Sequence, residues 1–181
     1  MKGFPKYFNS KEDYLFVVKN DMDREKTIQA LNALLATAKR KEPVWPDGYD
    51  PDAVLDNPTA EPVEPVDWKE VDDPNGRIFR LGFTIEEVNT LLEIVKTVRP
   101  FQDKLVQLKQ LIEEQDYSSA EEMRTSLSAE IPSLLSDIGL VDMLESLKDA
   151  LSSRNKTVAL QIIENAQGQV ENFIKNTTKE G

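Results

Sequence analysis

Apolar residues recur at helical spacing through most of the second half of the chain. The clearest stripe consists of Ala159, Ile163, Ala166, Val170 and Ile174. Steps of three and four residues place side chains on one face of an α-helix. Similar stripes precede this one, and Pro132 and Gly139 separate them with residues that end helices. The pattern predicts a mainly α protein with a multi-helix bundle over residues 85–181.

Polar residues mark where these helices begin and break. Thr84 and Glu87 stand in the T-x-x-E spacing of a capping box, which predicts a helix start at residue 85. Pro100, after Arg99, is expected to end or kink this first helix, because proline lacks an N–H group. Ser118 or Ser119 is expected to cap a later helix.

The N-terminal segment, residues 1–42, reads as a pair of shorter helices. Ser10 is a good cap for the first helix, and Asp21 or Asp23 can cap the second. The basic run at 39–41 is expected to form the last turn of the second helix, where cations complement the helix dipole.

The middle of the chain differs in composition. Residues 43–76 hold 7 of the 10 prolines, and 10 acidic side chains against 1 basic one. Because proline disrupts both helices and strand ladders, we interpret residues 43–65 as an acidic, extended or irregular linker. The aromatic residues Trp45, Tyr49 and Trp68 indicate that parts of this region lie against the fold.

Residues 66–84 predict a β-hairpin. The segments VDWKEV and RIFRLGF flank DDPNG, which is rich in turn-forming residues. In this interpretation Phe79 and Phe83 point inward, while Arg77 and Arg80 face water or the acidic linker. The alternative is a small anion site, in which both arginines act with the helix start at Thr84.

Composition excludes several kinds of chemistry. The 181-residue chain has no cysteine and no histidine, which removes thiolate nucleophiles, histidine-containing triads and nearly all zinc sites. The acidic residues Asp47, Asp50, Asp52 and Asp56 do not follow the spacing of a calcium loop. We therefore predict no catalytic residues, no metal site and no cofactor.

The net charge of −11 bears on partners and location. It disfavours a general nucleic-acid-binding face and an anionic membrane surface. No stretch approaches the roughly 20 apolar residues that span a bilayer, and the N-terminus has no apolar signal segment. The expected location is the cytoplasm.

Two segments carry a resemblance. The sequences GFPKYFNSKEDYLFV at residues 3–17 and RIFRLGFT at residues 77–84 resemble small accessory proteins found in prophages, which pair an FPK-x-FN-[ST]-K-x-D opening with a short domain. The resemblance covers about the first 85 residues. It implies a phage-related context but no activity, and the C-terminal helices do not share it.

These observations favour a non-enzymatic accessory or assembly protein that binds another protein. The candidate partner-binding residues are Trp45, Tyr49, Trp68, Arg77 and Arg80. Surplus apolar surface on the C-terminal helices leaves a homo-oligomer open. Two alternatives stand beside this hypothesis: an acidic protein that mimics nucleic acid and inhibits a DNA- or RNA-binding protein, and a carboxylate-dependent enzyme.

Overall fold

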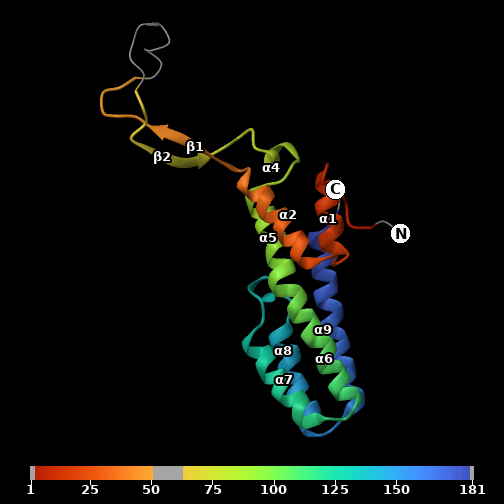
Figure 1. Ribbon diagram of the computed structural model, residues 1–181. Coiled ribbons are helices and arrows are strands. Elements are labelled where there is room, and N and C mark those ends of the chain that lie inside the picture. The colour runs from red at the N-terminus through yellow and green to blue at the C-terminus, as the bar shows by residue number, and fades with distance from the viewer. Residues whose placement is uncertain (1–2, 51–62, 180–181) are drawn as a thin grey trace.

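The computed structural model describes residues 3–50 and 63–179 and is mainly α-helical, as predicted (Figure 1). The elements in chain order are α1 (Lys11–Lys19), α2 (Arg24–Ala36), β1 (Lys39–Val44), β2 (Asp67–Asp72), α4 (Arg77–Arg80), α5 (Ile85–Glu93), the π-helical turn η1 (Ile94–Val98), α6 (Arg99–Glu113), α7 (Tyr117–Ala129), the 3-10 turn η2 (Ser133–Leu135), α8 (Leu140–Ser152) and α9 (Lys156–Thr177). None of the helices in the described ranges combines the length and the apolar character needed to cross a bilayer.

The C-terminal helices form the predicted bundle. Helix α9 packs against α6 and α8, and α7 packs against the same two helices (Figure 1). The residues of the predicted α9 stripe are all buried, namely Ala159, Ile163, Ala166, Val170 and Ile174. This outcome confirms that a sustained helical period in this sequence reports the core-facing side of a helix.

The first helix start of the bundle is confirmed in detail. The Thr84 hydroxyl accepts a hydrogen bond from the backbone N–H of Glu87 at 3.0 Å. In return, the Glu87 carboxylate accepts one from the backbone N–H of Thr84 at 3.2 Å. The prediction for α7 is wrong by two or three residues, because Asp116 caps this helix and accepts from the N–H of Ser119. Aspartate is as good an N-cap as serine, and Asp116 comes first in the chain.

The helix does not end at Pro100. It widens into the single π turn η1, in which the N–H of Arg99 donates to the carbonyl of Ile94, and then continues as α6. Pro100 comes directly after this turn, and since it has no N–H group to donate, the α-helical hydrogen bonding is interrupted there. The predicted disturbance is therefore one wide turn within a continuous helix.

The N-terminal helix pair shares its core with the bundle. Helix α2 packs against α5 and η1, and its Leu31 and Leu34 belong to the same buried cluster as the α6 and α9 side chains. Asp23 caps α2 by accepting from the N–H of Lys26 at 3.2 Å, as predicted. Ser10 stands at the N-cap of α1 without a side-chain capping bond.

The prediction for residues 39–41 is wrong. Helix α2 ends at Ala36, and the basic run begins strand β1 instead of forming a last helical turn. Two contacts stabilise the helix end: the Thr37 hydroxyl donates to the carbonyl of Leu34 at 2.7 Å, and it accepts from the backbone N–H of Ile78 at 2.9 Å.

The prediction of a β-hairpin over residues 66–84 is wrong about the strand that pairs with β2. Strand β2 pairs antiparallel with β1, in a register that runs from Lys39 opposite Asp72 to Val44 opposite Asp67. The RIFR segment forms the short helix α4, with Ile78 fully buried. Gly76 allows the chain to pass close to the end of α2 before α4, because a Cβ atom there would be 1.9 Å from the carbonyl oxygen of Thr37.

The interpretation of residues 43–65 as a linker holds in part. Pro43 and Val44 belong to β1. Residues 45–50 and 63–65 are irregular, and residues 51–62, with Asp52 and Asp56, lie outside the described residues.

Candidate functional site

Strands β1 and β2 form a ribbon that projects away from the helices, which we call the arm (residues 39–44 and 67–72; Figure 1). No arm residue is buried, and in β2 only Val71 is even half-buried. An element that buries so little contributes little to the stability of a core. Its exposed side chains are available to a partner.

The base of the arm is anchored firmly. The backbone N–H of Asp73 donates to the carbonyl of Ala38 at 2.7 Å, which joins the two ends of the arm. The Ala38 side chain is buried, and Thr37 is bonded to α4 through Ile78. The arm therefore leaves and re-enters the helical body at one point.

Opposite charges face each other across the two strands, and one of these pairs, Lys39 with Asp72, makes a direct ion pair. Three of the register pairs oppose an acid and a base: Lys39 with Asp72, Lys41 with Glu70, and Glu42 with Lys69. Such cross-strand pairs stabilise a ribbon. The hydrogen bond that the Lys39 ammonium donates to Asp72 raises the pKa of Lys39 above its ordinary value.

Apolar side chains gather toward the outer end of the arm. Trp68 stands opposite Pro43 and is 56% exposed, and Val66, just before β2, is also exposed. The rings of Trp45 and Tyr49 lie 5.2 Å apart between their centroids. Exposed tryptophan is uncommon on a surface that contacts only water.

The predicted partner-binding residues do not form one cluster. Trp45, Tyr49 and Trp68 belong to the arm and the segment that follows β1, whereas Arg77 and Arg80 lie on α4. The Arg77 guanidinium donates to the carbonyl oxygen of Phe8, which engages it within the protein. The alternative of an anion site at Thr84 gains no support, because Thr84 is occupied by its capping box.

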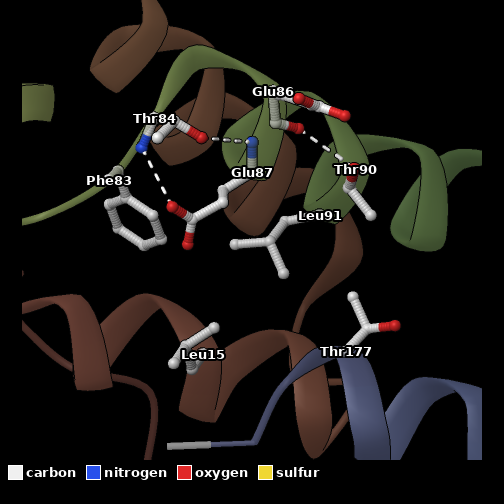
Figure 2. Close-up of a pocket in the computed structure, with 8 residues that line it drawn as sticks. All are labelled: Leu15, Phe83, Thr84, Glu86, Glu87, Thr90, Leu91 and Thr177. Atoms are coloured by element: carbon white, nitrogen blue, oxygen red, sulfur yellow. Dashed lines mark hydrogen bonds between the residues drawn. The ribbon is translucent and has the colours of Figure 1, made fainter. Parts of the chain in front are cut away.

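A hollow of about 250 Å³ lies beside this capping box (Figure 2). It is lined by Leu15, Phe83, Thr84, Glu86, Glu87, Thr90, Leu91 and Thr177. Its polar groups bond to one another or to the backbone: Thr90 donates to the carbonyl of Glu86, and Thr177 to that of Phe173. Among the described residues, the exposed carboxylate of Glu86 is left as the one side-chain polar group of this lining without a bonded partner.

The electrostatics of Glu87 also argue against acid catalysis at this hollow. The Lys11 ammonium lies 2.7 Å from the Glu87 carboxylate, and this hydrogen bond lowers the pKa of Glu87 below its ordinary value. A general acid needs a carboxyl group whose pKa is raised.

Sequence reasoning missed two buried arginines, Arg99 and Arg124, which are 5% and 6% exposed. Each lies on an apolar stripe, four residues after Val95 and Ala120, and this position was the available signal. Arg124 donates two hydrogen bonds to Glu121, and this contact raises the pKa of Arg124 and lowers that of Glu121. Both arginines connect elements of the body.

The helices of the bundle expose few large apolar side chains among residues 63–179. Val106, Val141 and Val158 are exposed and lie on three different helices. Single exposed valines are ordinary on a protein surface. The homo-oligomer stays a prediction.

Within the described residues, no group of three or more acidic side chains is arranged to hold a metal ion. Comparisons with known proteins give no match: no protein-family model, no curated protein and no solved structure is significantly similar to this chain.

Proposed function

We propose that the protein is a non-enzymatic accessory or assembly protein that binds another protein through its arm. The observation that carries this proposal is the projection of a ribbon without any fully buried residue from a body with a core of its own. A ribbon of two strands is marginal by itself in water. Its presence is best explained by a partner that covers it.

The composition of the arm supports a protein as the partner. Trp68 offers a large, rigid apolar surface, and tryptophan is the residue most enriched at the energetic centres of protein interfaces. The ribbon carries four acidic side chains (Glu42, Asp67, Glu70 and Asp72) and four basic ones (Lys39, Arg40, Lys41 and Lys69). This balance favours a protein surface over mimicry of nucleic acid, where carboxylates would follow one another like phosphates.

The proposal extends to the biological setting. We place the protein in the cytoplasm and in a phage-related context, on the resemblance of its N-terminal part to prophage accessory proteins. Neighbouring genes of phage structure or assembly would support this setting, and a conserved place among unrelated metabolic genes would argue against it.

Affinity capture with the full chain tests the proposed function. The criterion is that retention of the partner depends on the exposed side chains of the arm. We compare wild type with Trp68→Ser, and with Tyr7→Ser as the matched control, because Tyr7 is an exposed aromatic residue outside the arm. The partner should be retained by wild type and by Tyr7→Ser and lost with Trp68→Ser. Retention by all three proteins, or a lone monomer with no partner, would contradict the proposal.

A further inference from the structure

We infer that the arm binds its partner by accepting a third β-strand along the free edge of β2, and that this strand carries cationic side chains at alternate positions. This inference rests on the proposed function and specifies how the arm would perform it. It follows from the backbone geometry of the two edges and from the side chains of β2.

The register defines which backbone groups face outward. The hydrogen bond from Asp73 to Ala38 makes these residues a bonded pair. Bonded and non-bonded pairs alternate along an antiparallel ladder, so Arg40 and Val71 form the next bonded pair. The residues between them point their N–H and C=O groups away from the partner strand. On β2 these outward residues are Trp68, Glu70 and Asp72.

The two edges are not equivalent. On β1 the outward residues include Pro43, which has no N–H group to donate. Proline at an edge is a common means of preventing strand addition. Strand β2 contains no proline, so each of its outward residues keeps an N–H group. The N–H of Trp68 donates to the side chain of Asp67 at 2.8 Å, and among the described residues those of Glu70 and Asp72 are left for an added strand. A third strand therefore adds to β2 and not to β1.

The side chains of β2 define the charge of the added strand. Trp68, Glu70 and Asp72 are alternate residues of β2 and so lie on one face of the ribbon. Glu70 stands opposite Lys41 in the register, but none of the ion pairs among the described residues joins these two side chains, so a cation on the added strand can form an ion pair with Glu70. A cation opposite Trp68 gains a cation–π contact with an exposed ring. An added strand with positively charged residues at alternate positions can therefore contact both Glu70 and Trp68.

A peptide titration tests the inference with the full chain. The probe is a fluorescently labelled peptide of the length of β2 that alternates lysine with valine, and fluorescence anisotropy measures its binding. We expect it to bind at least about tenfold more tightly than the same peptide with glutamate in place of lysine. N-methylation of alternate backbone nitrogens should weaken binding about tenfold, because the ladder hydrogen bonds are lost. Equal binding of the methylated peptide would overturn strand addition.

Substitutions at Glu70 separate backbone from charge. Glu70→Pro removes an outward N–H group, as Pro43 does on β1. The pairing of β1 with β2 should survive, and protection of the inward amides of Arg40 and Val71 from hydrogen exchange is the control for it. Glu70→Gln keeps the N–H and removes the charge. We expect Glu70→Pro to lower peptide affinity about tenfold and Glu70→Gln by less. Equal affinity of the Glu70→Pro variant and wild type would overturn the inference.

The same variants keep this inference distinct from the proposed function. If Trp68→Ser abolishes partner capture and Glu70→Pro leaves it unchanged, the arm binds its partner without strand addition, and only the inference fails. Loss of capture with both variants supports the inference. If the wild type dimerises at high concentration, and Glu70→Pro abolishes that dimer, the occupant is a second copy of this chain and the cationic partner strand is refuted.

Discussion

The guanidinium group of Arg99 donates a hydrogen bond from Nη2 to the backbone carbonyl oxygen of Val18 at 3.0 Å. The same nitrogen donates to the carbonyl of Lys19 at 2.8 Å, and Nη1 donates to the side chain of Gln102 at 2.7 Å. The last carbonyls of α1 have no partner within their own helix, and this arginine on α6 satisfies two of them. The contact ties the N-terminal helix pair to the bundle across 81 positions of sequence.

Replacing Arg99 should therefore weaken the whole protein. We expect Arg99→Met to lower the free energy of unfolding by about 2–4 kcal/mol, because it removes the Arg99 hydrogen bonds to both carbonyls and its ion pairs with Asp21 and Glu171. Chemical denaturation followed by circular dichroism measures the loss. The control is Lys104→Met on the same helix, which removes an exposed ion pair with Glu130 and should cost less than about 1 kcal/mol. Equal losses in the two variants would contradict the role assigned to Arg99.

Gly76 should be intolerant of any side chain. A Cβ atom at this position would be 1.9 Å from the carbonyl oxygen of Thr37, and neither backbone can move without disturbing the base of the arm. We expect Gly76→Ala to destabilise the protein by about 1–3 kcal/mol. Gly168→Ala is the matched control, since nothing lies within 4 Å of its Cβ position in α9, and it should stabilise by roughly 0.5–1 kcal/mol. Thermal unfolding of the two variants decides the matter, and a gain in stability for Gly76→Ala would refute the close contact.

The ion pair between Lys11 and Glu87 should make stability depend on pH at the acidic end. The pKa of Glu87 is lower in the folded protein than its unfolded value of about 4.3, so the pair stabilises the fold above that pH. The stabilisation is lost as the pH falls through the folded pKa. We expect Glu87→Gln to be less stable than wild type at neutral pH, by under about 1 kcal/mol because the pair is exposed.

This difference between wild type and Glu87→Gln should vanish near pH 2, where both side chains are neutral. Denaturation curves at a series of pH values measure it. Glu86→Gln is the control for the helix dipole, because Glu86 stands in the same first turn but has no ion pair among the described residues. A constant difference at every pH would show that Glu87 acts through its capping bond alone.

The helical body should fold without the arm. Because Ala38 and Asp73 are joined by a hydrogen bond, residues 39–72 can be replaced by a two-residue Asn-Gly turn without moving α2 or α4. We expect the shortened protein to keep its helical circular-dichroism signal and to change its free energy of unfolding by less than about 1 kcal/mol. Loss of cooperative unfolding would mean that the arm belongs to the core. The shortened protein also serves as the non-binding control for partner capture.

The features that were predicted correctly depend on residues close together in sequence. The capping box joins Thr84 and Glu87 three positions apart, and the α9 stripe repeats in steps of three and four residues from Ala159 to Ile174. Local hydrogen bonds and helical periodicity can be recognised without knowing what the element packs against. The mainly α fold class follows from these signals.

The features that were missed depend on distant residues. Strands β1 and β2 are separated by the long segment 45–66. Charged residues rather than apolar ones face each other across them, so neither strand carries a strong pattern of apolar alternation. In RIFRLGF, apolar residues recur at alternate positions, as in a strand. The segment is nevertheless helical, where Gly76 packs against Thr37 and Ile78 is buried. The role of Arg99 was missed for the same reason, because its acceptors lie on α1.

The turn between α8 and α9, residues 153–155, lies at the end of the helical body opposite the arm (Figure 1). Because the chain contains no cysteine, a single thiol introduced beside this turn by Ser152→Cys would be the unique reactive site of the protein. Ser152 is exposed, so the change should be tolerated. A protein attached to a surface through this thiol would present its arm to the solution in one orientation.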